Sequence, residues 1–164
     1  FKESENQSLV YPKQIAFNVI PQCDIFLDNN FTKEEMKLTW ETHKILDPNI
    51  QVQATCVRVP VFNGHSEAVF FRVSKEISRE EIIKILDRTP GLKVLDDPSS
   101  GDYPTPFENA TDTEDVYVGR IRSQSLDDDC WISMWIVADN VYGKGAALNA
   151  VQICEELLNV SSVK

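Results

Sequence analysis

The stretch Thr55-Cys-Val-Arg-Val-Pro-Val-Phe-Asn-Gly-His-Ser-Glu-Ala-Val69 decides the predicted fold. Its apolar and β-branched residues favour strands, and Asn63-Gly64 closes two-residue hairpins because both positions tolerate a positive φ. We therefore predict an antiparallel strand pair in which Arg58 lies opposite Val69. Because paired residues share a sheet face and side chains alternate along a strand, Arg58 and His65 would point the same way, about 13 Å apart along the ladder.

Arg58 and His65 are the residues of this stretch with the clearest chemistry. An arginine fork binds a carboxylate or phosphate through two hydrogen bonds, and a histidine exchanges a proton near neutral pH. Together they would supply an anion clamp and an acid/base catalyst, which is half of an active site. The alternative is structural, with Arg58 in an ion pair and His65 capping the turn, and on the pattern alone this is the commoner outcome.

Several blocks of the chain, taken in order from about Ile15 to Leu158, resemble the C-terminal half of aspartate-β-semialdehyde dehydrogenases. The blocks are Phe31–Lys37, Thr55–Val69, Val118–Arg122, Val137–Asn140 and Lys144–Ile153. The resemblance implies an α+β fold of the type seen in the C-terminal domain of glyceraldehyde-3-phosphate dehydrogenase. In that fold helices pack on one face of a mixed, largely antiparallel sheet, and the other face builds a homodimer.

The resemblance also implies roles for five residues of a reductase that makes aspartate semialdehyde from aspartyl phosphate with NADP as cofactor. Arg58 would bind the substrate carboxylate, and His65 would be the acid/base catalyst. Glu34 would contact the substrate amine and Lys37 the phosphate. Asn140 would lie near the nicotinamide cofactor.

A purely structural role remains an alternative for three of these residues. Glu34 and Lys37 lie three apart on a predicted helix with Glu41 four further on, which also describes an exposed row of ion pairs worth tenths of a kcal/mol. Asn140 would equally suit a turn at the end of a strand.

Composition excludes several classes of protein. The net charge of −10 argues against nucleic acid or an anionic membrane as a partner, because both attract clustered Lys and Arg. No run approaches the roughly 20 apolar residues of a membrane span, and no signal peptide is recognisable. The 4 cysteines form no Cys-x-x-Cys pair and only 2 histidines are present, so we expect no metal site and reduced thiols in the cytoplasm.

Local signals predict the remaining elements. Thr32 with Glu35, and Ser78 with Glu81, form capping boxes that start two helices. Asp96–Asp115 has no periodicity and is expected to be a loop. We also expect a strand or extended segment at Ile15–Ile20, and we expect the two capped helices to end near Leu46 and Arg88. Strands are expected at Leu92–Leu95, Val116–Arg122 and Trp131–Val137, and the last two should pair. A final helix is expected at Ala146–Leu158.

We interpret residues 1–164 as one dimerisation and catalytic domain, with 1–13 as a loose terminus and without the NADP-binding domain. The family's nucleophilic cysteine and its glutamine would lie upstream, so the chain alone is expected to be inactive. Two alternatives stay open: a non-catalytic dimerisation module of the same fold, and a related acyl-phosphate semialdehyde reductase, against which the Glu34 and Lys37 motif argues.

Overall fold

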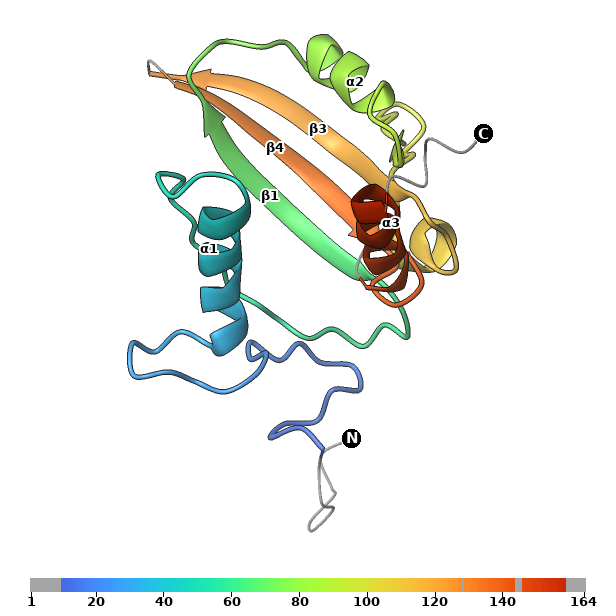
Figure 1. Cartoon of the computed structure of the whole chain (residues 1–164). Coiled ribbons are helices and arrows are strands. Elements are labelled where there is room, and N and C mark those ends of the chain that lie inside the picture. Colours follow the sequence, from blue (N-terminus) through green and yellow to red (C-terminus); the bar gives the residue numbers. More distant parts are fainter. Residues whose placement is uncertain (1–9, 128, 144–145, 159–164) are drawn as a thin grey trace. The chain divides into compact units, whose positions relative to one another are not determined.

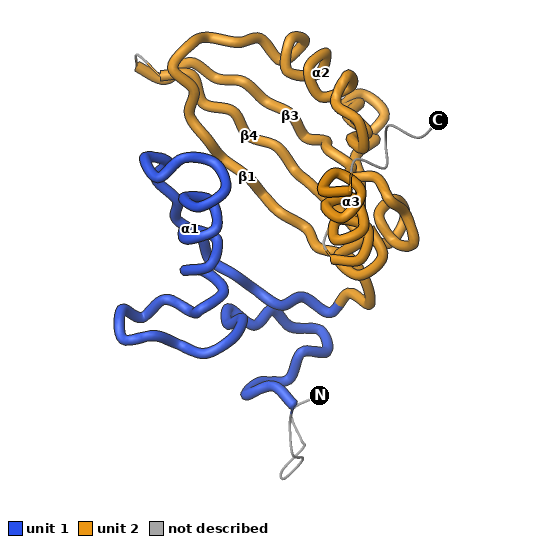
Figure 2. The backbone as a smooth tube through the Cα atoms, in the orientation of Figure 1, with its two compact units in different colours: residues 1–60 blue, residues 61–164 orange. Residues whose placement is uncertain are grey.

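The structure, a computed structural model, describes residues 10–127, 129–143 and 146–158. The chain forms two compact units, Phe1–Pro60 and Val61–Lys164, drawn in blue and orange in Figure 2. Most of the predicted terminus 1–13 lies outside the described residues. Residues 1–60 are called unit 1, and residues 61–164 are called unit 2.

Unit 1 is organised by helix α1, Lys33–Ile45. The predicted capping box is confirmed: the Thr32 hydroxyl accepts the Glu35 N–H, and the Glu35 carboxylate accepts the Thr32 N–H at 2.7 Å. These bonds satisfy two groups that a helix N-terminus would otherwise leave unpaired. The helix ends one residue before the predicted Leu46.

The predicted hairpin at Thr55–Val69 is wrong. Among the described residues, Thr55–Phe62 contributes no strand, and Arg58 forms a single antiparallel bridge with Ile20 instead of facing Val69. A type I′ turn needs a positive φ at both central residues, and only Gly64 has one, at 90°. Pro60 also lacks the N–H that a ladder requires. The chain therefore bends at Asn63-Gly64 without folding back on itself.

Unit 2 is built on a four-stranded sheet with the order β1-β4-β3-β2 (Figure 1). Its strands are β1 (His65–Val73), β2 (Leu92–Val94), β3 (Val116–Leu126) and β4 (Asp129–Ala138). β4 is antiparallel to both β1 and β3, and β2 is parallel to β3. The predicted pairing of β3 with β4 is thus confirmed, and so is the mixed, largely antiparallel α+β architecture.

Helix α2, Arg79–Asp87, covers one face of this sheet. Its predicted Ser78 and Glu81 capping box is present. Ile82 is buried with β-strand residues in the core, which consists of Ile82, Val118, Ile121, Ile132 and Met134. Ile83 and Leu86 pack against this core, whereas Ile85 is 57% exposed.

Other connections differ from the sequence prediction in detail. The loop before β3 contains a short π-helix, η1 (Pro106–Ala110), which contacts β3 and β4. Ile15–Ile20 is a turn in which the Asn18 N–H donates to the Ile15 carbonyl, and only Ile20 takes part in a bridge. The final helix is present as α3, Ala147–Leu158, and none of its described side chains is buried.

Candidate functional site

In unit 1, Arg58 is held by its backbone and left exposed at its side chain. Its N–H donates to the Ile20 carbonyl at 2.8 Å, and its carbonyl accepts the Ile20 N–H at 3.0 Å. The guanidinium lies over the Tyr11 ring, 5.1 Å from the centroid. Such a contact orients an arginine without using its fork of N–H donors, which remains suited to a carboxylate or phosphate.

Glu34 and Lys37 form an ion pair on the first turns of α1. Lys37 Nζ lies 3.1 Å from Glu34 Oε2, and both side chains are about 40% exposed. The hydrogen bond that Lys37 donates to Glu34, together with the negative charge of Glu34, raises the pKa of Lys37. The pair matches the exposed row that the sequence allowed, and exposed pairs of this kind are cheap to separate. A ligand with an amine and an anionic group could therefore take one partner each.

Cys23 joins these residues, which sequence reasoning did not foresee. Burial raises the pKa of its thiol, the positive charge of Arg58 opposes that rise, and the carboxylates of Glu34 and Glu35 add to it. Arg58 and Glu34 are thus both close enough to Cys23 to act on it electrostatically. Unit 1 therefore brings a guanidinium and a carboxylate near one thiol. In the sequence, 23 residues separate Glu34 from Arg58.

Glu35 connects the two segments that carry these groups. It is only 8% exposed, and besides its capping bonds its Oε1 accepts the backbone N–H of Cys56 at 3.0 Å. Hydrogen bonds from the backbone of Thr32 and then of Cys56 lower the pKa of Glu35. One buried carboxylate thus ties the start of α1, next to Glu34, to the backbone two residues before Arg58.

Replacing Glu35 with Gln should loosen this connection. The amide group has one acceptor oxygen, so it leaves one of the two N–H groups unpaired, which costs about 1–3 kcal/mol of unfolding free energy. Urea unfolding measures the loss, and faster hydrogen exchange at the Cys56 amide should accompany it. Glu41→Gln is the matched control because it removes the same charge from an exposed position of α1. Equal behaviour of the two variants would contradict the structural role of Glu35.

In unit 2, His65 is the first residue of β1 and pairs with Ala138, the last residue of β4. Side chains alternate along a strand, so His65 lies on the same sheet face as Val69 and Val73, which pack against the core beneath α2. The side chain itself is exposed at the end of the sheet. This placement frees its ring for proton exchange.

Asn140 lies beside His65 at this end of the sheet. Its Oδ1 accepts the N–H of Gly64 at 3.2 Å. The structure therefore places two of the predicted site residues close together in unit 2, and Arg58, Glu34 and Lys37 in unit 1.

Asp139, a residue that sequence reasoning did not single out, fixes the loop that carries Asn140. It is 3% exposed, and its carboxylate accepts N–H groups from Tyr142 and Val141 at 2.8 Å each and from Asp112 at 2.9 Å. These backbone donors, with that of Tyr142 the strongest, lower the pKa of Asp139. The signal available in the sequence was an Asp that lies between apolar strand residues and an Asn. Asp favours turns at the end of a strand, so this pattern indicates a turn that Asp139 stabilises.

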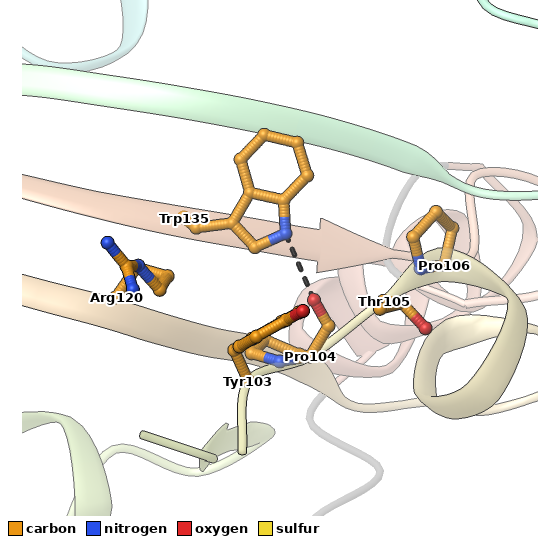
Figure 3. Close-up of a pocket in the computed structure, with 6 residues that line it drawn as sticks. All are labelled: Tyr103, Pro104, Thr105, Pro106, Arg120 and Trp135. Atoms are coloured by element: carbon orange, nitrogen blue, oxygen red, sulfur yellow. Dashed lines mark hydrogen bonds between the residues drawn. The ribbon is translucent and has the colours of Figure 1, made fainter. Parts of the chain in front are cut away.

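Unit 2 also contains a cavity of about 390 Å³ (Figure 3). At the edge of the cavity, Trp135 donates its indole N–H to the Pro104 carbonyl over 3.0 Å. Arg120, which has a φ of 54° at the β-bulge in β3, lines the same cavity. None of the predicted site residues lines it, so we do not assign it to the candidate site.

Two other classes of site find no support in the described part of the chain. It contains no cluster of three or more His, Cys, Asp or Glu side chains that could hold a metal ion. Within residues 10–127, 129–143 and 146–158, no helix is both long and apolar enough to cross a membrane. Cys23, Cys130 and Cys154 are free thiols.

Known proteins resemble this chain along most of its length. The family model for the semialdehyde dehydrogenase dimerisation domain matches residues 2–142. The aspartate-semialdehyde dehydrogenase of Legionella pneumophila is 51% identical over 149 residues, which are 90% of this chain and 42% of that protein. The enzyme of Aquifex aeolicus is 50% identical, over 90% of this chain and 43% of its own length.

Solved structures agree with these sequence relatives. Aspartate semialdehyde dehydrogenase II of Vibrio cholerae, complexed with ASA, superposes with a TM-score of 0.85 at 46% identity, over 93% of this chain and 44% of that one. The Candida albicans enzyme with NADP gives a TM-score of 0.65 at 27% identity, over 89% and 46%. The chain thus spans less than half the length of the relatives it matches. It belongs to the semialdehyde dehydrogenase family, within which it corresponds to the dimerisation domain.

Proposed function

We propose that this chain is the substrate-binding and acid/base half of an NADP-dependent aspartate-semialdehyde dehydrogenase. The reaction is the reductive dephosphorylation of L-aspartyl-4-phosphate to L-aspartate 4-semialdehyde, a step in the synthesis of lysine, methionine and threonine. The observation that carries the proposal is that unit 1 holds the exposed Arg58 guanidinium over the Tyr11 ring and pairs Glu34 with Lys37 on the first turns of α1. A guanidinium and a carboxylate suit the two charged groups of an amino acid.

In this proposal each charged side chain has one partner on the substrate. The Arg58 fork binds the α-carboxylate through two hydrogen bonds, and Glu34 accepts the α-amine. Lys37, released from its exposed pair with Glu34, binds the phosphate. His65 moves the proton, a role typically worth about 10²–10⁴ in rate.

Asn140 fits a contact with the nicotinamide cofactor. Its Oδ1 already accepts the Gly64 N–H, so its NH₂ group is the part left to donate, and a nicotinamide carboxamide offers a carbonyl acceptor. NADPH, the reduced cofactor, supplies the hydride when bound, and the main site for it would belong to the part of the relatives that this chain does not match. The NADP of the Candida albicans structure supports this choice of cofactor.

The nucleophilic cysteine of the reaction is proposed to lie outside this chain. Cys130 is buried in the core and Cys154 lies on α3. Burial raises the pKa of Cys23, which disfavours the reactive thiolate. The N–H of Cys56 is bound by the Glu35 carboxylate.

A homodimer in the cytoplasm completes the proposal. The sheet face opposite α2 presents Phe70, which is 67% exposed, and Trp131, which is 40% exposed. Exposed aromatic residues on a sheet suit a subunit interface. Free thiols agree with a reducing compartment.

The test joins this chain to the nucleotide-binding half of the Legionella pneumophila enzyme and compares the fusion with the chain alone. The fusion should form NADPH from NADP, L-aspartate 4-semialdehyde and inorganic phosphate, whereas the chain alone should form none. Light scattering checks that the fusion is a folded dimer. A folded, dimeric fusion without activity would favour a non-catalytic dimerisation module. Activity with an N-acetylglutamate semialdehyde instead would favour the related reductase.

A further inference from the structure

The ladder between β1 and β4 ends at the pair of His65 and Ala138. One residue further, Gly64 lies where the register would place it opposite Asp139, but its N–H donates to the side chain of Asn140 instead of a backbone carbonyl. An amide side chain thus extends the ladder by one hydrogen bond. That bond holds the peptide group between Asn63 and Gly64, one residue before His65.

Gly64 is also confined by its packing. Its φ is 90°, a conformation that side-chain-bearing residues rarely adopt, and a Cβ there would lie 3.0 Å from Pro106 Cβ and 3.3 Å from the Ala138 carbonyl. The backbone before His65 therefore has a steric boundary on one side. The hydrogen bond to Asn140 sets its orientation within that boundary.

The loop of Asn140 has little freedom of its own. Asp139 binds three backbone N–H groups, including that of Asp112, which follows η1. Gly143, at the other end of the loop, packs so closely that a Cβ would lie 2.7 Å from the Thr113 carbonyl. Because the loop is fixed at both ends, Asn140 is a rigid anchor for Gly64.

We propose that Asn140 and Asp139 are positioning residues for His65: Asp139 fixes Asn140, and Asn140 fixes the N–H of Gly64, the residue directly before His65. The inference rests on the acid/base role proposed above for His65. It gives Asn140 a function that is separate from contact with the cofactor. Small displacements of a catalytic group are costly, because an error of about 1 Å reduces rates by about 10²-fold.

Two variants of the active fusion separate these functions. Asn140→Ala removes the acceptor, so kcat should fall about 10–100-fold while KM for the semialdehyde stays within about twofold. Asn140→Asp keeps an oxygen acceptor for the Gly64 N–H but removes the NH₂ donor. Its kcat should therefore lie well above that of the Ala variant, whereas its KM for NADP should rise. Val141→Ala, in the same loop with an exposed side chain, is the control and should behave as the parent.

Hydrogen exchange provides a readout that needs no activity. In the 164-residue chain, the Gly64 amide should exchange about tenfold faster in Asn140→Ala, which corresponds to the loss of one hydrogen bond of about 1.4 kcal/mol. Asn140→Asp should keep most of its protection. Unchanged Gly64 exchange in Asn140→Ala, or an equal rise of KM for NADP in both variants without a fall in kcat, would overturn the inference. An inactive fusion would refute the proposed function, and the exchange result would still stand on its own.

Discussion

Replacing His65 with Gln should reduce kcat of the active fusion by about 10²–10⁴-fold, because Gln keeps hydrogen-bonding capacity but cannot exchange a proton at neutral pH. The residue is exposed at the first position of β1, and the surrounding sheet does not depend on its ring for packing. The variant should therefore fold as the parent does. KM for the semialdehyde should change little, since substrate binding is assigned to Arg58, Glu34 and Lys37.

The chain provides its own control, since His43 is the only other histidine. His43 lies on α1, and its Nε2 is 2.8 Å from the Ile50 carbonyl, which is a structural contact. His43→Gln should leave kcat within about threefold of the parent value, far from the loss expected at a catalytic acid/base. If His65→Gln retained more than about a tenth of kcat, the acid/base group would have to be sought elsewhere.

The helix starts and the pairing of β3 with β4 were predictable because their signals are local. A Ser or Thr followed three residues later by Glu satisfies the first backbone N–H groups of a helix whatever surrounds it, and both boxes formed. The alternation of β3 and β4 likewise reports one buried face. The capping box of Thr32 and Glu35 fixes the start of α1, and it therefore places Glu34 and Lys37 on the first turns of that helix.

The surroundings of Arg58 were not predictable in the same way. Asn-Gly indicates a hairpin only if both residues take a positive φ, and the pairing of β1 with β4, more than 50 residues away, decided otherwise. The bridge of Arg58 to Ile20 is likewise a tertiary contact with no local signal. Arg58 and His65 remain proposed site residues, but their shared strand face was an artefact of the assumed hairpin.

The same limit explains why two supporting carboxylates escaped notice. Glu35 was predicted only as a capping residue, and Asp139 was not distinguished from the turn around it. Each accepts a backbone N–H from a distant segment, Glu35 from Cys56 and Asp139 from Asp112, and each adjoins a proposed site residue. Burial of an acidic side chain among backbone donors is visible only after folding, because sequence does not reveal which donors a loop leaves unpaired.

Replacing Asp139 with Asn should lower the free energy of unfolding by about 1–3 kcal/mol at pH 7. One Asn oxygen can still accept the N–H groups of Val141 and Tyr142, but the NH₂ group then faces the N–H of Asp112, which is left unpaired. Asp97→Asn is the control: its carboxylate also accepts backbone and hydroxyl donors, which lower its pKa, but it is exposed, so its loss should be smaller.

The penalty for Asp139→Asn should also depend on pH. The backbone donors hold the pKa of Asp139 below its ordinary value of 3.8, so the folded state binds the proton less readily than the unfolded state. The carboxylate therefore contributes stability above about pH 3.8, and that contribution disappears as the pH falls through the lower folded value. Urea unfolding of both proteins at pH 7, 5 and 3.5 should show a gap that is constant between pH 7 and 5 and begins to narrow by pH 3.5. Since the other acidic groups titrate alike in both proteins, a gap that widened on acidification would mean that Asp139 is not held as the anion by these donors.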